Sequence, residues 1–212
     1  MHRRRTAALL VLAVATLAAF ALLAAAVTHG WGIVDVDRRV AERVATDMPT
    51  WAEWAARPFS WLGGWIGITA VSIAAVGSLL LARRAADAVW LAATVTGIQV
   101  LTAVTKAGYD RPRPDAGSPI PLPSSSAFPS GHASGAVVTF CAVAFLLLER
   151  RAERRLLVWI GVLGLCLGVG ASRVALNVHY LSDVVAGWCL GAAFLALAVL
   201  LRDALRSWRA TL

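Results

Sequence analysis

The chain has 212 residues, of which 59% are apolar, and a formal net charge of +8. Its mean hydropathy is positive, which is too apolar for an ordinary soluble domain of this length and predicts a membrane protein. The positive charge does not indicate a nucleic-acid partner, because the sequence contains no recognisable nucleic-acid-binding motif.

Six uncharged apolar runs predict six transmembrane helices, since each is near the roughly 17–25 residues that span a hydrocarbon core. They are Thr6–Val27, Ser60–Ala82, Ala88–Thr105, Ala133–Leu148, Leu156–Ser172 and Val184–Leu201. The fourth and fifth runs are short enough that a buried core helix is an alternative. A soluble all-helical bundle is disfavoured because every face of these segments is apolar. The predicted fold class is all-α, a polytopic membrane protein with a single domain over residues 1–212.

Basic residues predict how these spans are oriented. Twelve of the twenty lie on the side of the two chain termini: Arg3, Arg4, Arg5, Arg83, Arg84, Arg150, Arg151, Arg154, Arg155, Arg202, Arg206 and Arg209. Because cytoplasmic loops are enriched in Lys and Arg, we expect both termini to be cytoplasmic. The opposite ends of the helices would then face outward from a bacterial plasma membrane.

The first apolar run could instead be a signal peptide that is cleaved near Ala24–Ala26. Its length disfavours this alternative, because a signal core usually has roughly 7–15 apolar residues. The three cysteines, Cys141, Cys166 and Cys189, lie inside predicted spans at a spacing that matches no thiolate ligand pattern. They predict packing roles, and neither a disulfide nor a metal site.

Two outer segments depart from the pattern of spans. Residues 30–59, Gly30 to Phe59, predict an amphipathic helix that lies along the outer membrane surface, either as an anchor or as a substrate gate. Its apolar face comprises Ile33, Val36, Val40 and Val44, opposite Asp37, Arg38, Arg39, Glu42 and Arg43. Residues 107–130 contain six of the eight prolines and cannot form a helix. We expect this second segment to be a loop that carries Arg113 into a site.

The first group of candidate site residues is Lys106 with Arg113. Lys106 is the only lysine in a chain with nineteen arginines. A general enrichment in basic residues therefore does not explain why a lysine stands at the end of this apolar run. An ionisable residue there is either an anchor or part of a site. Arginine offers phosphate a planar fork, and lysine offers a compact point charge. Because Arg111-Pro112 repeats the Arg-Pro pair, either arginine could be the ligand.

The second group opens the fourth predicted span. Ser130 occupies an N-cap position and Gly131 allows close backbone approach, which together suit a cradle for an anion. A simple helix cap is an equally good interpretation of these two residues. His132 lies in the first turn, where an imidazole could give a proton to a leaving alkoxide.

The third group is the most specific. His179 and Asp183 are four residues apart, so they share one helical face, and the carboxylate can hold one ring nitrogen while the other attacks phosphorus. A structural His–Asp pair is the alternative. Arg173 ends the preceding span and supplies a second guanidinium fork.

A charge count supports phosphate as the ligand. Lys106, Arg113 and Arg173 are positive and Asp183 is negative, while a phosphate monoester carries nearly two negative charges at neutral pH. The filled site would therefore be close to neutral. No cluster of carboxylates is available to bind magnesium or calcium, and we expect neither a metal nor a cofactor.

The spacing of the three groups resembles the signature of the type-2 phosphatidic acid phosphatase superfamily, which includes membrane lipid phosphatases and soluble vanadium haloperoxidases. Every signature position is matched between Lys106 and Asp183. The resemblance implies that His179 becomes phosphorylated, that Asp183 orients it, and that His132 protonates the leaving group and then activates water. It also implies metal-free phosphate binding by Lys106, Arg113, Ser130, Gly131 and Arg173. The six predicted spans argue against the haloperoxidase branch.

The expected function is removal of phosphate from a lipid whose tail enters laterally between helices. Candidate substrates are undecaprenyl diphosphate, phosphatidylglycerophosphate and phosphatidate, with prenyl diphosphate weakly favoured because an outward site fits a carrier that is recycled on that face. A lipid phosphotransferase would share the same motifs, and an anionic-lipid or phosphate transporter is the alternative from another class. Membrane lipids are the expected surroundings, and no obligatory protein partner is indicated.

Overall fold

The computed structural model describes residues 2–114, 117–149 and 155–209. Of the basic residues that predict orientation, Arg150, Arg151 and Arg154 lie outside the described residues. Eight helices occupy the described part of the chain: α1 (His2–Thr28), α2 (Ile33–Asp47), α3 (Thr50–Gly63), α4 (Trp65–Leu81), α5 (Ala85–Ala107), α6 (Gly131–Leu148), α7 (Arg155–Ala175) and α8 (Leu181–Arg209). The predicted all-α membrane fold is confirmed.

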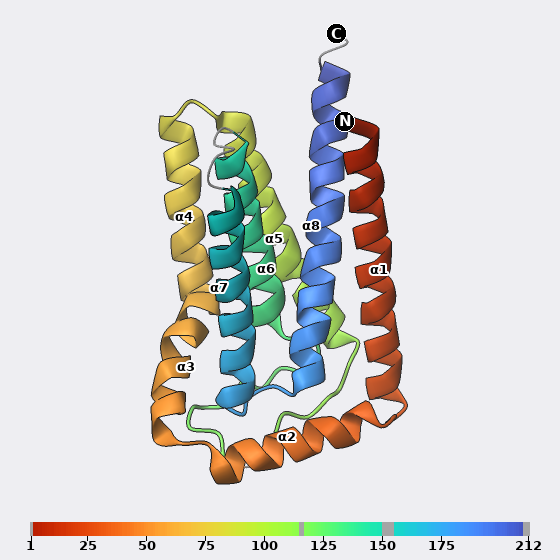
Figure 1. Cartoon of the computed structure of the whole chain (residues 1–212), viewed down its shortest axis with the longest axis vertical. Coiled ribbons are helices and arrows are strands. Elements are labelled where there is room, and N and C mark those ends of the chain that lie inside the picture. The colour runs from red at the N-terminus through yellow and green to blue at the C-terminus, as the bar shows by residue number, and fades with distance from the viewer. Residues whose placement is uncertain (1, 115–116, 150–154, 210–212) are drawn as a thin grey trace.

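Five of these helices, α1 and α5 to α8, are long and apolar enough to cross a membrane, and the bent pair α3–α4 can provide a sixth span. They form an upright bundle, with α1 and α8 side by side (Figure 1). Large apolar side chains are exposed on the outside of the bundle, for example Leu81 (89%) and Leu157 (73%). Such a surface suits lipid and not water.

The second predicted span, Ser60–Ala82, is broken near its start, because residues 60–63 belong to α3 and α4 begins at Trp65. The chain bends by 51° between α3 and α4, at Gly64, whose backbone is extended. The bend brings the start of α4 onto the end of α3, and a Cβ on Gly67 would lie 2.4 Å from the carbonyl oxygen of Leu62. Glycines permit this close approach, whereas hydropathy alone does not distinguish a bent span from a straight one.

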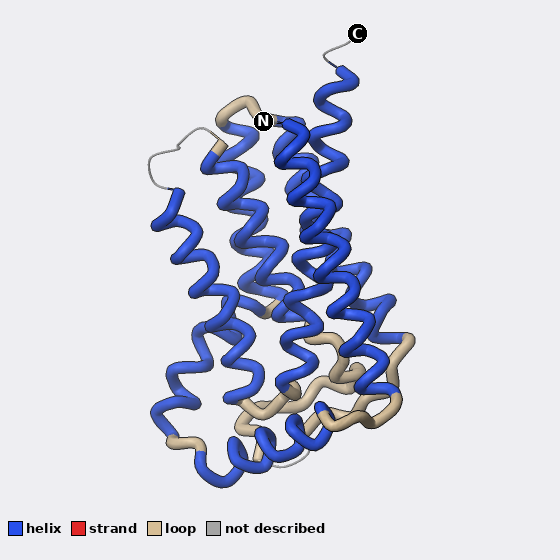
Figure 2. Tube along the Cα trace, turned by 45° about the vertical axis from the view of Figure 1, so that its right-hand side comes forward, coloured by secondary structure: helices blue, strands red, loops and turns tan. Residues whose placement is uncertain are grey.

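The outer segment at residues 30–59 also differs from a single surface helix. α2 lies across one end of the bundle, roughly perpendicular to the upright helices. The chain then turns into α3, which leads toward α4 (Figure 1). The loops that join α5 to α6 and α7 to α8 gather at this same end, above α2 (Figure 2). No helix forms at residues 108–114 or 117–130, as the prolines predict. We refer to the end of the bundle that α2 crosses as the α2 end.

α6, which begins with the second motif group, and α8, which carries Asp183 of the third, pack closely because α8 presents glycine to α6. A Cβ on Gly187 would lie 2.5 Å from the carbonyl oxygen of Ser130, and a Cβ on Gly191 would lie 2.8 Å from that of Ser134. Small residues let helix backbones approach in this way. The packing also allows the amide of Ser130 to donate to the carbonyl oxygen of Asp183, at 2.9 Å.

The opposite end of the bundle, where α1 begins and α8 ends (Figure 1), carries a network of charged side chains. Arg202 on α8 donates to Asp87 on α5 and to Glu149 after α6, both at 2.7 Å. Arg84 and Arg206 contact the same two carboxylates. Hydrogen bonds from Arg202 outweigh burial and hold the pKa of Glu149 below its usual value. This network ties three helices together far from the motif groups.

Candidate active site

His179 stands in the short turn between α7 and α8. The amides of Val178 and His179 donate to the carbonyl oxygen of Arg173, at 3.1 and 3.3 Å, which closes the end of α7. Asn177 takes a left-handed conformation with φ of 49°, which asparagine tolerates better than most residues. The turn therefore places a buried histidine, 3% exposed, just before α8 begins.

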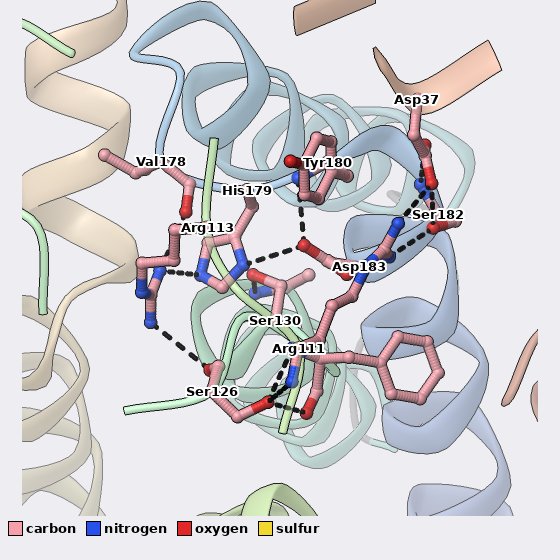
Figure 3. A network of polar contacts seen from close by, with 12 residues as sticks. Asp37, Arg111, Arg113, Ser126, Ser130, Val178, His179, Tyr180, Ser182 and Asp183 are labelled. Atoms are coloured by element: carbon pink, nitrogen blue, oxygen red, sulfur yellow. Dashed lines mark hydrogen bonds and ion pairs between the residues drawn. The ribbon is translucent and has the colours of Figure 1, made fainter. Parts of the chain in front are cut away.

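Asp183 lies in the first turn of α8 and faces back toward that turn. Its Oδ2 accepts from the amide of Tyr180 at 2.9 Å and lies 3.4 Å from Nδ1 of His179. The amide contact satisfies one of the donors that every helix start leaves open and fixes the carboxylate. The carboxylate is thereby held beside the imidazole, as the four-residue spacing predicts (Figure 3).

Arg113 defines the protonation of the histidine ring. Its Nη1 lies 3.0 Å from Nε2 of His179 and donates to the carbonyl oxygen of Val178 at 2.8 Å. A guanidinium has only donors, so Nε2 must be the unprotonated acceptor, and the ring proton stays on Nδ1 toward Asp183. Burial, opposed by Asp183, lowers the pKa of His179 to about 4. The imidazole is therefore neutral near pH 7, and its ring lone pair lies on Nε2, toward Arg113.

The 107–130 loop holds Arg113 in place. The Nε of Arg113 donates to the carbonyl oxygens of Pro123 and Ser125, at 3.1 and 3.2 Å. Lys106, at the end of α5, donates from Nζ to the carbonyl oxygen of Ser126 at 2.5 Å. The loop thus brings Arg113 to His179 and contacts Lys106 at the end of α5, as expected of a segment stiffened by proline.

The start of α6 contributes the second group. Ser130 is fully buried and is the N-cap, because its Oγ accepts from the amide of Ala133 at 3.5 Å. His132 follows in the first turn, and its electrostatic neighbours are Arg173, His179, Arg113 and Lys106. A Cβ on Gly64, at the α3–α4 bend, would lie 3.5 Å from Nε2 of His132. The bend therefore lies directly beside this imidazole.

Arg173 approaches from the last turn of α7. It is 3% exposed, and its Nη1 donates to the hydroxyl of Ser60 at the end of α3. Among the described residues, no hydrogen-bond partner contacts its Nε. Buried donors are nearly always satisfied in native proteins, so this nitrogen is a strong candidate for contact with a bound anion.

Sequence reasoning left the choice between Arg111 and Arg113 open, and the structure separates them. Arg111 donates to Asp183 Oδ1 at 2.5 Å and to Asp37 Oδ2 at 2.7 Å, and its guanidinium lies 4.5 Å from the ring centroid of Tyr180. Its side chain is 9% exposed. Both ends of its fork are occupied by carboxylates, so Arg113 is the better placed of the two for phosphate.

Asp37 is the residue that sequence analysis placed wrongly. It was expected on the charged face of α2, but it is 1% exposed and contacts Arg111 and Ser182. Its position four residues after Ile33 and three before Val40 puts it in the middle of the apolar face. A lone carboxylate on that face was the available signal for a buried partner.

Within the described ranges, no group of three or more His, Cys, Asp or Glu side chains is arranged to hold a metal ion. What the structure gathers at the α2 end is a neutral imidazole, a carboxylate behind it, a second imidazole and the three cations Lys106, Arg113 and Arg173. Such an arrangement can bind a phosphate group, and it presents a nitrogen lone pair to phosphorus.

Comparison with known proteins identifies relatives of this chain. Phosphatidylglycerophosphatase B of Bacillus subtilis (strain 168) is 25% identical over 175 residues, which cover 81% of this chain and 86% of that protein. A crystal structure of the first transmembrane PAP2-type phosphatidylglycerolphosphate phosphatase from Bacillus subtilis matches with a TM-score of 0.84 and 24% identity, covering 91% of this chain and 96% of that one. The family model of the PAP2 superfamily matches residues 87–207, so the chain belongs to the PAP2 superfamily.

Proposed function

We propose that this PAP2-superfamily phosphatase removes a phosphate group from a membrane lipid through a phosphohistidine intermediate. The observation that carries the proposal is the contact between Arg113 and Nε2 of His179. It keeps the proton on Nδ1, toward Asp183, and leaves the attacking lone pair beside a phosphate-binding guanidinium. In the complex, the fork of Arg113 would turn to the phosphate oxygens.

In the first step, Nε2 of His179 attacks phosphorus and the bond from phosphorus to the lipid oxygen breaks. His132, in its imidazolium form once the anionic phosphate is bound beside it, gives its proton to that oxygen, which leaves as the lipid alcohol. In the second step, His132 takes a proton from water while the water oxygen attacks the phosphohistidine, which releases phosphate and restores the free ring. Lys106, Arg113 and Arg173 stabilise the charge on the phosphoryl oxygens in both steps, with the start of α6 at Ser130 and Gly131 as the backbone cradle.

The substrate that the comparisons favour is phosphatidylglycerophosphate. The curated relative carries that activity in its name, which outweighs the weak preference for prenyl diphosphate from the sequence alone. An apolar groove of about 700 Å³ between α4 and α5 runs from Trp65, next to the α3–α4 bend, toward the opposite end of the bundle at Leu80 (Figure 1), and it gives an acyl chain a place. The lipid would keep its tail in hydrocarbon while its headgroup reaches the cations.

The proposed setting is a bacterial plasma membrane with both termini in the cytoplasm and the α2 end outside. The arginines at the end opposite α2 support this orientation. Arg3, Arg4, Arg5, Arg84, Arg202 and Arg206 all belong to the end where α1 begins and α8 ends, which the preference of basic residues for the cytoplasm assigns to the inside.

The test is phosphate release by the purified protein in detergent, with chelator present, from phosphatidylglycerophosphate, phosphatidate and undecaprenyl diphosphate. We expect chelator-insensitive release that is fastest from phosphatidylglycerophosphate and abolished in His179→Ala. His29→Ala is the matched control, because His29 is an exposed histidine after α1 and its loss should change nothing. Undiminished release by His179→Ala would overturn the proposal, and dependence on a divalent metal would overturn its metal-free chemistry.

A further inference from the structure

We propose that Asp37, on α2, is a positioning residue for the reaction, acting on His179 through Arg111 and Asp183. The inference rests on the proposed function and adds a residue that lies outside the three motif groups. Its basis is one unbroken line of contacts from α2 to the imidazole, drawn in Figure 3.

The line has three links. Asp37 Oδ2 accepts from Arg111 Nη2 at 2.7 Å, Asp183 Oδ1 accepts from Arg111 Nη1 at 2.5 Å, and Asp183 Oδ2 lies 3.4 Å from His179 Nδ1. Both carboxylate side chains are fully buried. A planar guanidinium with a carboxylate on each side has a fixed orientation. Asp37 therefore sets the angle at which Arg111 holds the carboxylate that orients the histidine.

Asp37 also contacts α8 directly. Its Oδ1 accepts from the amide of Ser182 at 3.0 Å and its Oδ2 accepts from the hydroxyl of Ser182 at 2.5 Å. A carboxylate at a helix start satisfies open amides and is favoured by the helix dipole. This contact by itself is a structural role, and the test must separate it from an effect on chemistry.

The charge of the cluster gives the reason to expect such an effect. Asp37 and Asp183 share Arg111, so the three groups together carry one excess negative charge. When Nε2 of His179 forms its bond to phosphorus, the ring keeps the proton on Nδ1 and becomes cationic. The excess negative charge stabilises that cation, and a buried site with little water screens it weakly. Without the charge of Asp37, Arg111 and Asp183 together are neutral. The cationic ring of His179 then has no excess negative charge beside it.

The experiment compares Asp37→Asn with Asp35→Asn, the same substitution at a solvent-exposed position two residues away on α2. Asparagine keeps the size and an oxygen for the Ser182 amide but removes the charge. We expect kcat of Asp37→Asn to fall about ten- to hundredfold, as for partners that orient a reacting group. The Michaelis constant and the inhibition constant of inorganic phosphate should stay within about threefold of wild type. Asp35→Asn should behave as wild type.

A double-mutant cycle tests the route through Arg111. If Asp37 acts through that guanidinium, adding Asp37→Asn to an Arg111→Gln variant should lower kcat further by less than about twofold. Asp37→Glu and Asp37→Gln form a second pair that differs in charge at equal length, and the glutamate variant should retain at least about tenfold more kcat. This pair keeps the test decisive if Asp37→Asn purifies poorly.

Three results would overturn the inference: unchanged kcat in Asp37→Asn, an equal kcat loss in the Arg111→Gln background, or parallel losses of kcat and phosphate affinity. Any of them, combined with an inactive His179→Ala, would leave the proposed function standing. Activity that survives in His179→Ala would instead overturn the proposed function itself.

Discussion

At the scale of single residues, the proposed chemistry depends on which nitrogen of His179 carries the proton. Arg113 can only donate, and it faces Nε2 at 3.0 Å, while a carboxylate faces Nδ1. The two neighbours therefore enforce the same tautomer from opposite sides of the ring. In the proposed mechanism, the nucleophile is thus prepared in the free protein, before any substrate supplies binding energy.

The first prediction concerns the charge of that ring. Burial favours its neutral form, so its pKa lies at about 4, below the ordinary 6.5. As pH falls from 7 to 5 the ring should stay neutral, and it should gain a proton only as pH falls through about 4. Nuclear magnetic resonance of ¹⁵N-histidine-labelled protein, with the His179 signals assigned by their loss in His179→Ala, measures this directly. Protonation of His179 with a midpoint near 6.5 would contradict the assignment.

The second prediction concerns its carboxylate partner. Asp183→Asn keeps the shape of the side chain but gives up its charge. Loss of the tautomer-fixing charge should lower kcat by roughly 10⁴-fold, the scale seen when a buried aspartate behind a catalytic histidine is neutralised. Asp203→Asn, at the opposite end of the bundle in a contact with Arg5, is the matched control. Loss of less than about tenfold in Asp183→Asn would show that the carboxylate does not orient the ring.

At the scale of elements, the site depends on how closely α6 and α8 approach. Gly187 and Gly191 let the α8 backbone meet the α6 start, where Ser130 and Asp183 are joined by a backbone hydrogen bond. The motif residues of two helices are thus held in register by residues that have no chemistry of their own. Small-residue packing is the usual means of helix approach in membranes.

The third prediction tests that packing. A methyl group at Gly187 would lie 2.5 Å from the carbonyl oxygen of Ser130, and backbone cannot yield as a flexible side chain can. Gly187→Ala should therefore lower the stability of the protein by about 1–3 kcal/mol. This loss should appear as a lower thermal midpoint in detergent, and kcat should fall as well. Gly161→Ala on α7 is the control, because nothing lies within 4 Å of its added Cβ. Equal behaviour of the two variants would show that the α6–α8 spacing tolerates the methyl group.

The elements also show what sequence could and could not predict. Apolar runs and prolines predict the membrane helices and the 107–130 loop, because both patterns depend on local composition. The bend at Gly64 and the burial of Asp37 depend on contacts between distant segments, which periodicity in one segment does not encode. The helical position of Asp37 among Ile33, Val40 and Val44 was informative, but only a partner such as Arg111 makes a buried carboxylate acceptable.

The whole molecule has two polar ends with different roles. The α2 end gathers the motif residues, loops and a surface helix, whereas the opposite end is held by the Arg202 network. The motif spacing predicts which residues meet at the α2 end, since the family signature gives their identities. It does not predict the contacts by which Ser60 and Asp37 secure Arg173 and Arg111, because these partners lie outside the signature.

The fourth prediction tests this division between the ends. Arg202 is 4% exposed and contacts Asp87 and Glu149, so Arg202→Met should lower stability by about 3 kcal/mol, the low end for a broken buried ion pair, since Arg84 still neutralises Asp87. Arg206→Met removes a half-exposed partner of the same carboxylates and should cost far less. Thermal unfolding in detergent measures both. Per folded molecule, kcat should be unchanged in each variant, and a large fall in kcat would show that the two ends are coupled.

The most direct measurement of the central claim is rapid acid-free quenching of the enzyme during turnover of ³²P-labelled phosphatidylglycerophosphate, followed by mapping of the protein-bound label. The account predicts an alkali-stable, acid-labile phosphoryl group on His179, absent from His179→Ala and formed faster than phosphate is released. Full turnover by active enzyme with no label on His179, or with the label on His132 instead, would contradict it.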